Sequence, residues 1–114
     1  PDSVVRDRLL SLDALSIAEA ALQTGTSGFV GDSVPLALFA ARAVARIGFA
    51  EMLGQIIAVG GDTDTIASIA GQVAGAALGL SGLPGHLVEL LPEREMILDV
   101  AREFAARLAQ GRVR

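Results

Sequence analysis

Residues 60–79 read GGDTDTIASIAGQVAGAALG: two glycines, two aspartates and two threonines, then a long uncharged segment. The segment after Asp64 consists of small and apolar residues without proline, which favours a helix from Asp64 to about Leu80. Glycines recur in it at every fourth position, 71, 75 and 79. Because each glycine inside a helix costs up to about 1 kcal/mol relative to alanine, three of them imply a packing demand. We therefore expect a fully buried helix whose glycines let neighbouring backbones approach closely.

The same glycine spacing also occurs in membrane helices that associate. A bilayer span needs about 20 consecutive apolar helical residues. Here Gly79 and Pro84 end the helix after roughly 16 residues, or about 24 Å, and Ser68 and Gln72 interrupt its apolar surface. We therefore expect the helix to belong to a water-soluble protein without a membrane partner.

The rest of the chain also favours helices. Apolar periodicity and turn residues predict four more of them, at about residues 2–23, 32–47, 49–59 and 92–110. Asp2 or Ser3 is a candidate cap for the first helix. If the second begins near Asp32 or Ser33, Pro35 lies in its first turn, where the missing N–H loses no partner. No strand alternation persists, so we expect an all-α domain of about five helices over residues 1–114.

Composition limits the classes of function. The 114 residues are 52% hydrophobic but only 4% aromatic, so the core must be built from alanine, leucine, isoleucine and valine. The net charge is −4 and all nine basic residues are arginines, without a basic face of the kind that binds nucleic-acid polymers. We expect most of these arginines to lie on solvated helix faces. The absence of cysteine fits a reducing compartment, and we expect a cytoplasmic protein.

The acidic residues at the start of the buried helix permit two interpretations. A single aspartate is enough to cap a helix, and the others would then lie in an exposed loop. Two partly buried carboxylates, however, repel each other, which raises at least one pKa unless a cation neutralises them. Asp62, Asp64 and the Thr65 hydroxyl can converge after the tight turn that Gly60 and Gly61 allow, and divalent cations such as Mg²⁺ prefer oxygen ligands.

Two motifs resemble one known family. Residues 60–79 are similar to the C-terminal signature of the ADP-ribosylglycohydrolases, and GFVGDSVPLALFAA, residues 28–41, resembles the segment that precedes it. Leu83-Pro84 and the closing helix agree with this order, so the resemblance covers about residues 28–109. It implies the C-terminal portion of an all-α enzyme that removes ADP-ribose from modified substrates with two Mg²⁺ or Mn²⁺ ions.

The resemblance also implies roles for individual residues. Asp62, Asp64 and Thr65 match metal ligands, and Gly28 and Phe29 match a loop beside the adenosine moiety of the ADP-ribosylated substrate. Ser33, as noted, is interpreted first as a helix cap and second as a ligand contact.

The family's other metal ligands and its catalytic acid come from an N-terminal part, for which no matching cluster precedes Thr24. Asp7, Asp13 and the only histidine, His86, are interpreted as surface residues. We therefore expect this chain to lack the N-terminal half, to be inactive alone, and to need that half as a preceding segment or a separate chain. The alternative is a truncated, inactive relative that serves as a binding or structural module.

Overall fold

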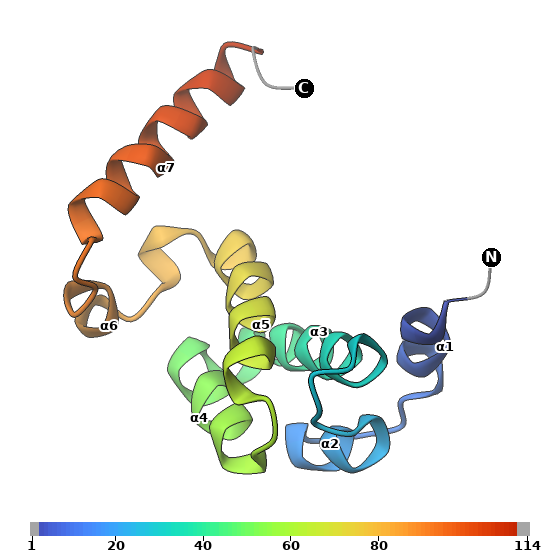
Figure 1. Cartoon of the computed structure of the whole chain (residues 1–114). Helices are drawn as coiled ribbons and strands as arrows, with labels where there is room; N and C mark the ends of the chain where they lie inside the picture. Colours follow the sequence, from blue (N-terminus) through green and yellow to red (C-terminus); the bar gives the residue numbers. More distant parts are fainter. Residues whose placement is uncertain (1–2, 112–114) are drawn as a thin grey trace. The chain divides into compact units, whose positions relative to one another are not determined.

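The computed structural model describes residues 3–111, and every regular element in that range is helical (Figure 1). The described residues form seven α-helices and one 3-10 helix: α1 (Val4–Ser11), α2 (Ile17–Thr24), α3 (Val30–Ile47), α4 (Phe49–Val59), α5 (Thr63–Leu78), η1 (Leu80–Gly82), α6 (Gly85–Glu89) and α7 (Arg94–Ala109). They divide into two compact units, residues 3–83 and residues 84–111. The all-α prediction is confirmed, but the expected number of about five helices is wrong.

Helix α3 is the centre of the first unit, because α1, α2, α4 and α5 all lie against it. The core contains large side chains without any exposed surface, such as Leu36, Met52 and Ile56. Alanines of α2, α3 and α5, among them Ala20 and Ala40, are equally buried and let the helix axes approach closely. The prediction of a core of alanine, leucine, isoleucine and valine is therefore confirmed for the buried hydrophobic residues, with Met52 as the exception.

The first predicted helix is two helices. Ser3 caps α1, since its Oγ accepts a hydrogen bond from Arg6 N at 3.4 Å, whereas Asp2 lies outside the described residues. A new cap then starts α2: Ser16 Oγ accepts from Glu19 N at 3.1 Å, and the Glu19 carboxylate accepts from Leu15 N at 2.6 Å. This is a form of the capping box, in which a serine and a glutamate three residues apart satisfy the free N–H groups of a helix start.

Helix α3 begins earlier than the sequence indicated. Its cap position is Phe29, and Ser33 is a buried residue inside the helix whose Oγ donates to Phe29 O at 3.2 Å, so the prediction of Ser33 as a cap is wrong. Pro35 consequently lies beyond the first turn, and its missing N–H leaves Gly31 O without the usual helical donor. The predicted break at Gly48 is confirmed, with φ of +84° between α3 and α4.

Helix α5 is not buried on all sides. Within the described residues only Ile66, Ala70 and Ala74 are buried along it, a single stripe that faces the core. A Cβ at Gly71 would meet only Phe49, at an ordinary 3.7 Å, and a Cβ at Gly75 would have open space. The expectation of close backbone contacts at these glycines is therefore wrong for this chain.

None of the helices in the described range is long and apolar enough to cross a membrane.

The second unit contains α6, which the sequence interpretation missed, and α7, which was predicted within two residues. Pro84 occupies the cap position of α6. Helix α7 carries large apolar side chains that are about half exposed: Ile97, Val100, Phe104 and Leu108. Nothing within residues 84–111 therefore covers this side of α7.

Candidate metal centre

Residues 60–65 form a tight turn that leads into the first residues of α5, and we call this segment the 60–65 turn. Gly60 and Gly61 both have positive φ, at +73° and +77°, a region that side chains rarely adopt. Asp62 follows at the cap position of α5, and its backbone oxygen accepts from Ile66 N at 3.1 Å. Its side chain makes no capping hydrogen bond. The Asp62 carboxylate is therefore not used to start the helix.

A second segment, the 25–29 loop between α2 and α3, lies directly against this turn. Asp62 N donates to Thr26 O at 2.7 Å. A Cβ at Gly61 would lie 2.2 Å from the same oxygen, and a Cβ at Gly28 would lie 2.7 Å from Asp62 Oδ2. At Gly61 only glycine leaves room for the contact, because the neighbour is a backbone oxygen, whereas at Gly28 the neighbour is the end of the Asp62 side chain. The fold thus brings Gly28 and Asp62, from the two motifs singled out in the sequence, into contact.

The neighbouring acid is held by hydrogen bonds. Asp64 Oδ1 accepts from Thr65 N at 3.0 Å. A hydrogen bond with the Asp62 carboxyl, followed by those from backbone N–H groups, holds the pKa of Asp64 below its ordinary value. The shift is opposite to the increase that repulsion between the carboxylates would cause in Asp64, because hydrogen bonding stabilises its ionised form. Asp64 is exposed and Asp62 and Thr65 are partly buried, so the carboxylates are accessible.

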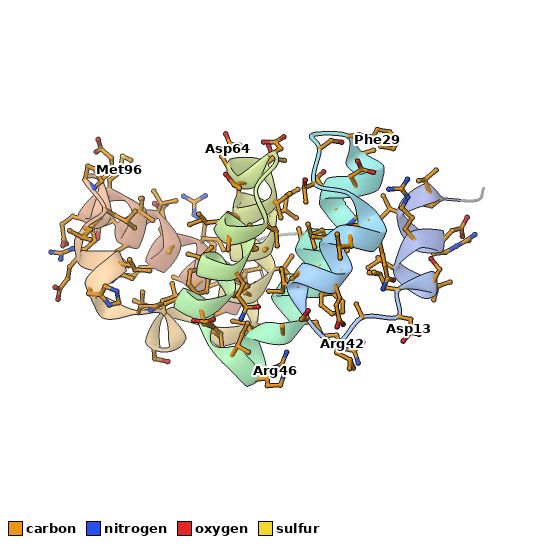
Figure 2. All side chains as sticks on the ribbon, turned by 90° about the horizontal axis from the view of Figure 1, so that it is seen from below. Asp13, Phe29, Arg42, Arg46, Asp64 and Met96 are labelled. Atoms are coloured by element: carbon orange, nitrogen blue, oxygen red, sulfur yellow. The ribbon has the colours of Figure 1, made fainter. Side chains whose placement is uncertain are left out.

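Phe29 lies at the same end of the first unit as Asp64 (Figure 2). Its ring rests on the first turn of α3, where a Cβ at Gly31 would lie 2.5 Å from Phe29 Cε1. The side chain is nevertheless 56% exposed. The Phe29 ring is therefore accessible to solvent, while its assignment to the substrate stays a prediction.

The donor set of the 60–65 turn suits a hard divalent cation, because Asp62, Asp64 and Thr65 offer oxygen atoms alone. It is a small set: across residues 3–111 no group of three or more histidine, cysteine, aspartate or glutamate side chains is placed to hold a metal ion. His86 is exposed on α6, in the other unit, and Asp7 and Asp13 are exposed as predicted.

The sequence interpretation missed three residues beside the candidate site. Arg8 was assigned to a solvated helix face, but its guanidinium contacts Asp32, whose side chain is only 19% exposed. Ser27 Oγ donates to the other oxygen of that carboxylate at 2.7 Å. Pro35 was the signal for this network, because a proline inside a helix leaves a carbonyl oxygen that another donor must satisfy.

Comparison with known proteins gives two matches. The sequence pattern described as ADP-ribosylglycohydrolase matches residues 2–113. Over 88 residues the chain is 35% identical to a Pseudomonas putida (strain GB-1) protein named ADP-ribosylarginine hydrolase Tri1. That alignment covers 77% of this chain but 23% of the Tri1 protein, so the chain spans less than a quarter of its relative. No solved structure matches.

Proposed function

We propose, from the premise that this chain belongs to the ADP-ribosylglycohydrolase family, that it forms part of a metal-dependent hydrolase that removes ADP-ribose from modified substrates. One observation supports the location of the proposed site in this chain. The 25–29 loop and the 60–65 turn, which match the family's adenosine and metal segments, are in contact through Thr26 O and Asp62 N at 2.7 Å.

In the proposed enzyme Asp62, Asp64 and Thr65 hold part of a site for two Mg²⁺ or Mn²⁺ ions. The Asp62 carboxylate has no capping role, and the Asp64 carboxylate accepts a hydrogen bond from Thr65 N. Both therefore keep oxygen lone pairs for a cation. When bound, the cations would supply Lewis-acid chemistry for hydrolysis of the glycosidic bond. Gly28 and Phe29 contact the adenosine end of the substrate, where the exposed ring offers a flat apolar surface.

The proposed acceptor is an arginine side chain, because Tri1 carries that specificity in its name.

The remaining metal ligands and the catalytic acid belong, in this proposal, to the N-terminal half of the enzyme, joined to this chain or separate. The first unit has apolar side chains that such a partner would cover: Leu15 and Leu22 are 86% and 88% exposed around α2. A groove of about 370 Å³ also lies there, lined by residues that include Leu22, Thr26 and Val59. Exposed apolar side chains grouped beside a groove are typical of interaction sites.

A second candidate is an inactive relative that binds ADP-ribose or serves a structural role. Within residues 3–111 no group of three or more metal-binding side chains of the four usual types is placed to hold an ion, which fits this candidate as well as the first. The two candidates differ in a measurable way, since only the first requires turnover.

The test measures release of ADP-ribose from an ADP-ribosylated arginine peptide, with the protein as its source makes it and Mg²⁺ or Mn²⁺ added. Asp62→Asn and Asp64→Asn should each lower kcat by at least about 100-fold if the carboxylates hold the cations. Asp13→Asn, which changes an exposed aspartate between α1 and α2, is the matched control and should keep full activity. Full turnover by both site variants would reject the metal role, and no turnover by the unchanged protein would favour the inactive module.

A further inference from the structure

Arg8 lies where three helices of the first unit meet. Its Nη1 donates to Thr24 O, in the last residue of α2, at 2.6 Å, and to Gly31 O, in the first turn of α3, at 2.9 Å. The same nitrogen contacts Asp32 Oδ1. Both carbonyl oxygens need a donor from outside their helix, because α2 ends at Thr24 and Pro35 has no N–H to offer Gly31. One guanidinium therefore satisfies the end of α2 and the start of α3 together.

Asp32 connects Arg8 to the 25–29 loop. While Oδ1 contacts Arg8, Oδ2 accepts a hydrogen bond from Ser27 Oγ at 2.7 Å. Ser27 Oγ in turn accepts from Phe29 N at 3.2 Å. The loop also passes closely over the carboxylate, since a Cβ at Gly25 would lie 2.8 Å from Asp32 Oδ2. The Asp32 side chain therefore fixes the backbone path of the loop from Gly25 to Phe29.

On its other side the loop touches the candidate metal centre. Thr26 O accepts from Asp62 N, and Gly28 lies beside the Asp62 carboxylate. Ser27, which Asp32 holds, stands between these two residues in the chain. A change in the position of Ser27 must therefore move at least one of the two contacts that locate Asp62.

We propose that Asp32, held by Arg8, is a positioning residue that fixes the 25–29 loop against Asp62 and thereby sets the cation affinity of the 60–65 turn. The inference rests on the proposed function, because it assigns to Asp62 a cation to bind. It adds residues that touch neither metal nor substrate. Outer partners of metal ligands commonly change affinity by about 10–100-fold when they are removed.

The experiment uses the protein as its source makes it and titrates Mn²⁺ alone, by calorimetry and by the electron paramagnetic resonance signal of the free ion. Asp32→Asn removes the charge, and Ser27→Ala, which leaves the Arg8 contact in place, is the milder variant. Each should raise the Mn²⁺ dissociation constant about tenfold, the lower end of the range for outer partners. Ser27→Thr keeps the hydroxyl and should restore the affinity of the unchanged protein.

The matched control is Asp99→Asn, which removes the exposed ion pair of Asp99 with Arg102 on α7. It should leave the affinity unchanged. Amide hydrogen exchange, measured without metal, gives a second readout. Asp32→Asn should accelerate exchange of Asp62 N–H, which is bonded to the loop, but not that of Ala70 in the middle of α5.

The outcomes separate the two claims. If the unchanged protein binds Mn²⁺ and both Asp32→Asn and Ser27→Ala bind it equally well, the positioning role is overturned while the proposed function stands. If the unchanged protein binds no Mn²⁺, the proposed function is overturned, and the inference with it. Weaker binding together with faster exchange at Asp62 supports the inference.

Discussion

Replacing Gly61 with alanine tests whether the contact between the 60–65 turn and the 25–29 loop holds the first unit together. The new methyl group would lie 2.2 Å from Thr26 O and 2.3 Å from Thr26 Oγ1. The backbone oxygen cannot rotate away, so the two segments must separate by about 1 Å to reach an ordinary contact. That movement breaks the hydrogen bond from Asp62 N to Thr26 O, now 2.7 Å long.

The magnitude follows from two parts. A side chain at positive φ costs about 1–2 kcal/mol, and loss of the partly buried hydrogen bond adds about 1 kcal/mol. We therefore expect Gly61→Ala to lower the free energy of unfolding by about 3 kcal/mol, which for a unit of this size corresponds to a fall in Tm of roughly 12–24 °C. Gly60 is the matched control, since it has the same sign of φ, +73°, but nothing within 4 Å of its Cβ position.

Urea unfolding followed by circular dichroism at 222 nm measures both variants. Gly60→Ala should cost only the backbone part, about 1–2 kcal/mol. Gly54→Ala, at an exposed position inside α4, should instead stabilise the protein by about 0.5–1 kcal/mol. Equal losses for Gly61→Ala and Gly60→Ala would refute the reasoning, because the contact with Thr26 would then contribute nothing.

Three further predictions concern stability. The hydrogen bond from Ser27, and then the Arg8 guanidinium, hold the pKa of Asp32 below its ordinary value of 3.8. Because this pKa is lower in the folded than in the unfolded protein, the ionised carboxylate stabilises the fold at pH values above the unfolded pKa. The difference in free energy of unfolding between the unchanged protein and Asp32→Asn, measured in urea, should therefore be constant from pH 7 to about pH 5 and shrink as the pH falls below 3.8. A difference that grows on acidification would contradict this. Ile66→Ala, at a fully buried position of α5, should cost about 2–5 kcal/mol in the same assay, whereas a loss below 1 kcal/mol would mean that the core around it is not closely packed. Ser16→Ala should cost about 1 kcal/mol through loss of the α2 cap, with Ser11→Ala on exposed α1 as the control; equal losses would argue against the capping bond.

Helix type and most helix ends could be predicted from local sequence. Gly48 ends α3 and Gly60 ends α4 because each adopts a positive φ that other residues avoid. The division between α1 and α2 was also readable, from Ser16 and Glu19 three residues apart. The burial of α5 could not be predicted from its sequence. The helix is apolar on every side, but the described residues cover only the one stripe of its surface that contains Ile66, Ala70 and Ala74.

For the candidate site, the sequence motif could single out Asp62, Asp64 and Thr65 as predicted ligands but could not place Gly28 beside Asp62. That contact joins residues 34 positions apart and depends on how α3 and α5 lie together. Arg8 was hidden for the same reason. Its three acceptors are 16 to 24 residues away, and an arginine near a chain end has no local pattern that distinguishes a structural role from a solvated one.

The proline inside α3 also has a consequence for the order of folding. Because Gly31 O receives its donor from Arg8, 23 residues earlier, the first turn of α3 cannot complete its hydrogen bonds until α1 has docked. Contacts between distant residues form late, after shorter loops have closed. The hydrogen bond from Asp62 N to Thr26 O joins residues 36 positions apart, a longer loop than the one between Arg8 and Gly31. We therefore expect the acidic turn to gain its contact with the 25–29 loop after α1 has docked on α3.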